Sequence, residues 1–148
     1  MNFDAIPIGK SVRFAKTVSE SDVYLFAGIT GDFASNHTNE AYMRETSFGG
    51  RIAHGALLVG YTSRASTMMV DALAGVVDQY LPVALGFDRI RFLKPVLIGD
   101  TITVIYEISA TDPARMCTTA KIEIYNQVND QVLAADHIMK WLPLHAAT

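Results

Sequence analysis

Residues 28–63 read GITGDFASNHTNEAYMRETSFGGRIAHGALLVGYTS, and the rest of the chain is organised around this stretch. Its first part, GDFASNH, places Asp32 and His37 five residues apart among turn-forming Gly, Asp, Ser and Asn, with no helical periodicity. We therefore expect a loop there, which can direct a carboxylate and an imidazole at one small molecule. The last part opens an apolar segment at Gly55, where we expect a helix to begin.

The segment from Gly55 to about Leu73 is predicted to be the longest helix. Arg64 and Asp71 interrupt it, so we expect a buried helix and not a membrane span. Apolar side chains recur along it at helical spacing and form one wide face, which predicts that most of the helix is buried. That face comprises Leu57, Leu58, Tyr61, Ala65, Met68, Met69 and Leu73. A helix this apolar needs a sheet to cover it.

The second half of the chain predicts such a sheet, because four segments alternate or are rich in strand-forming residues. These segments are residues 83–93, 101–110, 117–126 and 131–141, with turn residues between them. Upstream, a first strand is expected over residues 10–18, then a helix capped by Ser19 that ends near Gly31, and a short helix over residues 39–46. This order predicts an α+β fold with an antiparallel sheet, as one domain over residues 1–148.

Composition limits the class of protein. The chain has 148 residues, 50% of them hydrophobic and 18% charged, and a net charge of −3, which is typical of a globular protein and argues against a broad nucleic-acid-binding face. Cys117 is the only cysteine, so an internal disulfide and the CxxC pairs of metal sites are excluded. The N-terminus lacks a cationic start followed by an apolar run, so we expect no secretory signal and a cytoplasmic location.

The residues around the GDFASNH run predict acid–base chemistry. The first backbone N–H groups of a helix have no internal partner, and Gly55 would leave them open to a ligand. Together with Asp32 and His37 they would make an acid–base pair and an oxyanion hole. Singly, Asp32 could be a turn residue and His37 a structural histidine; their combination favours the functional interpretation. His54, at or just before the helix start, is expected to be mainly structural.

A metal site is a further interpretation of the same residues. Asp32, His37 and His54 have the residue types of a two-histidine, one-carboxylate site. Any three ligand-type residues would meet that test, however, and we do not expect a metal.

The same residues resemble those of a known family. Gly31-Asp32-Phe33-Ala34-Ser35-Asn36-His37 is followed by Ile52-Ala53-His54-Gly55-Ala56-Leu57-Leu58, by Phe92-Leu93-Lys94-Pro95-Val96 and by Gly99-Asp100. In this order and spacing the chain resembles the MaoC-like (R)-specific enoyl-CoA hydratases and 3-hydroxyacyl-CoA dehydratases of the hot-dog superfamily. The family pattern is roughly G-D-x-N-P-x-H, so Ala34-Ser35 replaces its Asn-Pro pair.

The resemblance implies a fold and a set of roles. A hot-dog domain wraps a curved antiparallel sheet around one long helix, and such domains pair, so we expect a homodimer or a larger homo-oligomer. Asp32 and His37 would be catalytic, Gly55 would help hold the thioester oxygen, and Ser63 would line the pocket with His54. No metal or cofactor is implied, because coenzyme A is part of the substrate; neither a nucleic acid nor a membrane is expected as a partner.

Two further points concern the substrate. Arg89, Arg91 and Lys94 put three cations near one strand end, usually a solvated face, and they are candidates for the phosphates of coenzyme A. Two alternatives stay open: a hot-dog acyl-CoA thioesterase, which has no need of the Asp32–His37 pair, and a non-catalytic acyl-CoA-binding subunit of the same fold, which the Ala34-Ser35 departure favours.

Overall fold

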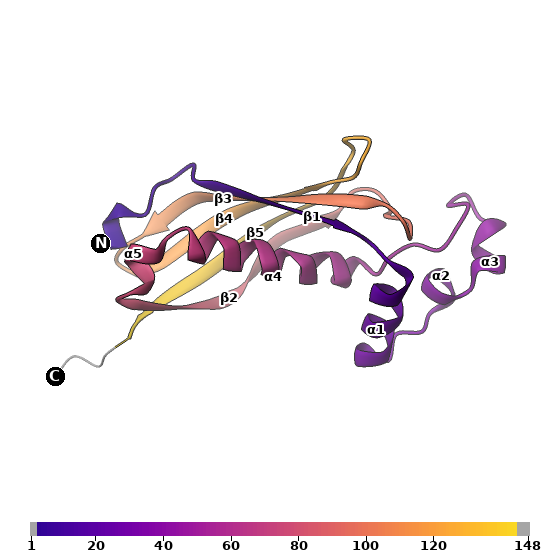
Figure 1. The fold of residues 1–148 in the computed structure, drawn as a ribbon, viewed down its shortest axis with the longest axis horizontal. Coiled ribbons are helices and arrows are strands. Elements are labelled where there is room, and N and C mark those ends of the chain that lie inside the picture. Colours follow the sequence, from indigo (N-terminus) through magenta and orange to yellow (C-terminus); the bar gives the residue numbers. More distant parts are fainter. Residues whose placement is uncertain (1–2, 145–148) are drawn as a thin grey trace.

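The structure is a computed structural model that describes residues 3–144. One antiparallel sheet of five strands in the order β1-β3-β4-β5-β2 dominates it, and Figure 1 shows α4 running along one face of that sheet. The elements in chain order are a short 3-10 helix Phe3–Ala5, β1 Ser11–Thr17, α1 Glu20–Thr30, α2 Ser35–Thr38, α3 Glu40–Arg44, α4 Gly55–Asp71, α5 Ala74–Val77, β2 Tyr80–Phe92, β3 Thr101–Asp112, β4 Cys117–Tyr125 and β5 Gln131–Pro143.

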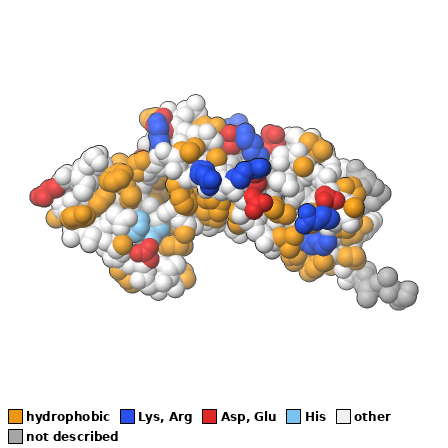
Figure 2. Space-filling model, turned by 180° about the vertical axis from the view of Figure 1, so that it is seen from behind, with side chains coloured by type: hydrophobic (Ala, Val, Ile, Leu, Met, Phe, Trp, Pro, Cys, Tyr) orange, Lys and Arg blue, Asp and Glu red, His pale blue; other side chains and the backbone are white. Residues whose placement is uncertain are grey.

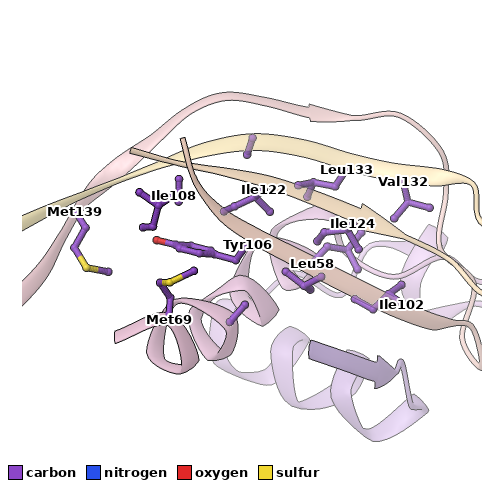
Figure 3. Close-up of a cluster of buried hydrophobic side chains, with 14 of the residues drawn as sticks. Leu58, Met69, Ile102, Tyr106, Ile108, Ile122, Ile124, Val132, Leu133 and Met139 are labelled. Atoms are coloured by element: carbon purple, nitrogen blue, oxygen red, sulfur yellow. The ribbon is translucent and has the colours of Figure 1, made fainter. Parts of the chain in front are cut away.

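The core lies between α4 and the sheet. Side chains along β3 alternate between a buried face and a more exposed one, as a strand with one face on the core requires. The buried members of β3 and β4 meet Leu58 and Met69 of α4, as Figure 3 shows. The members of β3 and β4 that belong to this hydrophobic core are Ile102, Val104, Tyr106, Ile108, Ala120, Ile122 and Ile124. The apolar face predicted for the long helix is therefore the one that packs on the sheet.

The helix α1 has strong signals at both ends. Ser19 and Asp22 form a capping box, in which each side chain accepts a hydrogen bond from the backbone N–H of the other. Burial alone would raise the pKa of Asp22, but hydrogen bonds from Lys16 and Ser19 outweigh it and lower that pKa to about 2. At the other end Gly31 has a φ of 80°, a left-handed conformation that glycine adopts without strain. This cap sets the direction in which the chain leaves for Asp32.

The three helices α1, α2 and α3 gather at one end of the molecule, beyond the first turn of α4 (Figure 1). Arg51 ties this group together, because its guanidinium contacts Glu20 of α1 at 2.8 Å and Glu40 of α3 at 2.9 Å. The residues quoted first in the sequence thus form a small helical lobe against the start of the long helix.

The strands β1 and β2 form the two edges of the sheet. β2 is the longer edge, and its register with β5 shifts twice, between Ala84 and Gly86 and between Asp88 and Arg91. Large apolar side chains on it are exposed, among them Leu85 and Phe92. An exposed apolar edge is a surface that favours pairing with another strand.

The predicted α+β order and antiparallel sheet are confirmed, as are the positions of the long helix and the five strands. One local prediction was wrong: the GDFASNH run is not wholly a loop, because Ser35–Thr38 form the short helix α2 that carries His37. Four residues are too few to show helical periodicity, so the sequence contains no signal for this turn. In the described part of the chain, no helix is long and apolar enough to cross a membrane.

Candidate active site

Asp32 follows directly on the glycine that ends α1. One of its carboxylate oxygens accepts a hydrogen bond from the backbone N–H of Ala34 at 3.2 Å, which closes a turn and fixes the side chain. The side chain is 51% exposed. The second carboxylate oxygen therefore remains available to solvent or to a ligand.

His37 is held by both of its ring nitrogens and is only 8% exposed. Its Nδ1 lies 2.7 Å from the carbonyl oxygen of Ile52, and a carbonyl can only accept, so Nδ1 carries the proton. Its Nε2 then has a free lone pair, which accepts a hydrogen bond from the side-chain amide of Asn36 at 3.1 Å. The imidazole is oriented as a base whose proton-accepting atom is Nε2.

His54 lies behind the other two residues. Its ring stacks on that of His37 with centroids 3.7 Å apart, and its Nε2 donates to the backbone carbonyl oxygen of Asp32 at 3.0 Å. With 2% exposure it is buried against Phe26. The predicted structural role of His54 fits this position: it joins the start of α4 to the two candidate catalytic residues.

One ligand atom from each of Asp32, His37 and His54 lies within 4.8 Å of the others. A carboxylate oxygen and an imidazole nitrogen at this separation can both contact one bridging water molecule. The same three residues do not fit a metal well, because the His54 nitrogen that faces Asp32 carries a proton in its bond to the carbonyl and has no lone pair there. The donor set therefore favours water over a metal ion.

The helix α4 begins beside these residues and contributes free amides. The first hydrogen bond of the helix runs from the Leu57 N–H to the His54 carbonyl, which leaves the N–H groups of Gly55 and Ala56 ahead of it. A pocket of about 470 Å³ opens here between α4, the lobe and the end of β2. It is lined by Asn36, His37, Phe48, Ile52, Ala53, Gly55, Ala56, Leu58, Phe92, Leu93, Lys94, Pro95 and Val96, and not by Asp32, which lies beside His37.

Seen from behind, the molecule shows histidine beside an acidic side chain, with hydrophobic side chains around them (Figure 2). The pocket thus combines apolar walls with a few polar groups, which is typical of sites for small organic molecules.

Phe92 is a feature of the site that sequence reasoning missed. A Cβ atom added to Gly55 would lie 2.8 Å from two carbons of the Phe92 ring, so the ring packs directly on the glycine. The two residues are far apart in sequence and come from α4 and β2, and no sequence signal links them. A side chain at position 55 would therefore displace the Phe92 ring as well as cover the amides.

The structure separates the three candidate cations. Arg89 bonds to Asp136 and lines a different depression together with Lys121. Arg91 donates to the carbonyl of its neighbour Ile90. Of the three, Lys94 lines the pocket at Gly55, and a contact of Arg89 or Arg91 with the phosphates of coenzyme A remains a prediction. A bulge between Asp88 and Arg91 shifts the strand register, which sequence spacing does not reveal.

Ser63 lies farther along α4, away from His37. It lines a second cavity, next to Ser66, and this cavity touches the first pocket at Ala56. Ser63 therefore does not line the pocket at His37 and Gly55, and its role in substrate binding remains a prediction.

The Ala34-Ser35 pair can be tested directly, because the structure has room for the residues that the family pattern contains there. Ala34 is the N-cap of α2 and makes no capping bond with its side chain, while Ser35 is its first residue and its N–H has no partner among the described residues. Asparagine is a good N-cap and proline a good first residue. The double variant Ala34→Asn, Ser35→Pro is expected to raise the free energy of unfolding by about 1 kcal/mol.

Chemical denaturation of the double variant and of both single variants measures this change, and any catalytic activity of the site is expected to stay equal or rise. The backbone of Ala34, at φ −56° and ψ 147°, already suits a residue before proline. A folded double variant without activity would contradict the interpretation that this pair affects only the order of the turn.

Comparison with known proteins agrees with the motif. The model of the MaoC like domain matches residues 4–132. An (R)-specific enoyl-CoA hydratase of Rhodospirillum rubrum is 39% identical over 118 residues, which cover 79% of this chain and 76% of that protein. A 3-hydroxybutyryl-CoA dehydratase of Methylorubrum extorquens is 33% identical over 131 residues, covering 88% and 77%.

The fold agrees as well. The solved structure of an (R)-hydratase from A. caviae involved in PHA biosynthesis superposes with a TM-score of 0.77 at 25% identity, over 94% of this chain and 98% of that chain. The resemblance predicted from the GDFASNH and His54-Gly55 motifs is confirmed, and with it the hot-dog fold.

Proposed function

The chain belongs to the MaoC-like family, and from that premise we propose that it is an (R)-specific enoyl-CoA hydratase. It would add water to trans-2-enoyl-CoA to form (R)-3-hydroxyacyl-CoA, or run the same reaction as a dehydration. The observation that supports this most is the placing of a carboxylate and an imidazole within 4.8 Å of each other, beside the first amides of α4.

The thioester carbonyl would accept hydrogen bonds from the N–H groups of Gly55 and Ala56. Negative charge develops on that oxygen when water attacks C3, and both the amides and the dipole of α4 stabilise it. The same polarisation draws electrons from the C2–C3 double bond toward the carbonyl. No metal or redox group takes part in this scheme, and coenzyme A enters only as part of the substrate.

Asp32 and His37 would hold the attacking water between them. His37 can take a proton at Nε2, because its Nδ1 proton is committed to Ile52. Asn36 contacts that nitrogen in the free protein and would yield the position to water. As the water oxygen bonds to C3, the pair takes one proton from the water and delivers one proton to C2. The number of protons on the pair is therefore the same before and after the reaction. The two groups are coupled, and we treat them as one unit.

Incubation with crotonyl-CoA tests the proposal. We expect loss of the enoyl thioester absorbance without release of free thiol, and chiral analysis of the product should give the (R)-3-hydroxy acid. Release of thiol would instead indicate a thioesterase, and binding without reaction would indicate a non-catalytic subunit. Either result would overturn the proposal.

The edge strand β2 supports a homodimer. Its exposed apolar side chains, including Leu85 and Phe92, leave an edge that a second copy can cover, and Phe92 also lines the pocket. We expect light scattering to give a dimer or a larger oligomer for the protein. Leu85→Lys, which places a charge on this edge, is expected to weaken the association.

Val128→Lys is the matched control, because Val128 is an exposed apolar residue outside the strands, in the turn between β4 and β5. It should leave the mass unchanged. A fully active monomer would contradict the predicted assembly, and equal effects of the two lysines would show that β2 is not the contact.

A further inference from the structure

A second cavity, of about 350 Å³, lies between α4 and the strands β2 and β5. Ala56 lines both this cavity and the pocket at Gly55, so the two adjoin. The far end of the cavity is marked by Ser66, about 16 Å along the helix from Gly55 at about 1.5 Å per residue. A chain that starts at the Gly55 amides can therefore extend into it.

One buried polar side chain reaches this cavity without a partner of its own. His137 of β5 lines the cavity, is 3% exposed, and its Nε2 makes no hydrogen bond among the described residues. Its Nδ1 lies 2.8 Å from the hydroxyl of Tyr106, and its ring stacks on Phe87 with centroids 4.5 Å apart. The imidazole is thus fixed in orientation, and only one of its two ring nitrogens has a hydrogen-bond partner among the described residues.

The protonation of His137 follows from Tyr106. The tyrosine is buried and has no other partner for its O–H among the described residues, so it donates to Nδ1. The ring proton must then lie on Nε2, which makes that atom a donor. Burial lowers the pKa of His137, which keeps the ring neutral near pH 7. A buried N–H donor without an acceptor costs free energy that a ligand oxygen can recover.

We propose that the cavity holds the far end of the acyl chain and that His137 donates a hydrogen bond to an oxygen on it. The enzyme would then prefer enoyl thioesters with an uncharged oxygen, a hydroxyl or keto group, near the far end of the chain. This inference rests on the proposed function. The remaining walls are mainly apolar and carry no charge, and the Ser66 hydroxyl already donates to the Ser63 carbonyl at 2.9 Å. The Ser63 hydroxyl also lines the cavity, but His137 supplies the buried donor there that lacks an acceptor among the described residues.

Matched substrates test the proposal. The ratio of kcat/KM for each ω-hydroxy enoyl-CoA to that of its plain counterpart is measured for a series of chain lengths, from the shortest up to those that span the roughly 16 Å between Gly55 and Ser66. We expect a ratio of about 10 in favour of the hydroxylated substrate at one chain length, because the plain chain leaves the donor unpaired. A ratio near 1 at every length would overturn the proposal and indicate that water satisfies His137.

Three variants assign the effect. His137→Phe keeps a ring but no donor, and the ratio should fall to about 1 or below; His137→Gln keeps a donor and should retain part of the preference. Ser66→Ala is the matched control, and it should retain the ratio because that hydroxyl is occupied by Ser63. A preference that survives in His137→Phe, or one that is lost in Ser66→Ala, would contradict the assignment.

Binding separates this inference from the proposed reaction. If crotonyl-CoA is not hydrated, the proposed function fails, and calorimetry with saturated acyl-CoA and its ω-hydroxy analogue still measures the same preference. Tighter binding of the hydroxylated ligand, lost in His137→Phe, would support the cavity assignment without turnover. Equal binding of the two ligands would overturn it.

Discussion

Replacing Asp32 by Asn, or His37 by Ala, is expected to slow crotonyl-CoA hydration by about 10²-fold or more. Asn keeps the oxygen that accepts from the Ala34 N–H, so Asp32→Asn removes the charge while the turn stays intact. His37→Ala removes the nitrogen that would take the proton of the water. Stopped-flow or steady-state measurement of both variants gives the size of each effect.

The double variant distinguishes a unit from two independent groups. If the two residues act on one water, the double variant is expected to be little slower than the poorer single variant, because effects within a catalytic unit are not additive. Independent groups would multiply their losses. A folded His37→Ala protein with a near wild-type rate would refute the mechanism, and in that case Asp32 and the helix amides would favour a thioesterase.

Stability must be measured alongside the rate, because the two residues differ in burial. Asp32 is half exposed, and Asp32→Asn is expected to change the free energy of unfolding by less than about 1 kcal/mol. His37 is buried, bonds to Ile52 and stacks on His54, so His37→Ala is expected to cost about 1–3 kcal/mol. His37→Gln is a second variant that keeps a polar side chain. Asp112→Asn, at the end of β3, is a matched carboxylate control for Asp32, because Asp112 also accepts a hydrogen bond from a backbone N–H, that of Arg115 at 3.0 Å.

Gly55→Ala is expected to reduce the hydration rate by about 10²-fold, with a small effect on folding. The added methyl group would lie over the first amides of α4, where the thioester oxygen is proposed to bind. It would also meet the far end of the Phe92 side chain at 2.8 Å, and the ring must shift to make room. The better helix propensity of alanine offsets part of the cost of that shift. Rates and thermal melts of the variant measure the two effects separately.

Phe92→Ala identifies which contact of the methyl group matters. If the methyl acts on the substrate, Gly55→Ala combined with Phe92→Ala is expected to stay slow. If the displaced ring blocks the pocket instead, the combination should recover the rate of Phe92→Ala alone. A Gly55→Ala protein with an unchanged rate would contradict the assignment of the oxyanion hole to the start of α4.

The sequence by itself determined the elements and the central motif of the site. Local patterns predict these features, because each pattern acts within one or two turns of the chain. The patterns are the alternation along residues 101–110, the apolar face after Gly55, and the capping signals at Ser19 and Gly31. Asp32, His37 and Gly55 could be named because they lie in one short stretch. The roles assigned to them remain predictions that the experiments above test.

Only the tertiary structure decided what faces the site from elsewhere. Two contacts join residues that are distant in sequence: the ring of Phe92 packs on Gly55, and Tyr106 bonds to His137. A β-bulge separates Arg89 from Lys94, which lie close together in the sequence. The stacking of His54 on His37 likewise depends on how α4 meets the helical lobe. Such contacts follow from packing between elements, which no local spacing encodes, so the sequence indicated the candidate reacting groups and the fold determined their surroundings.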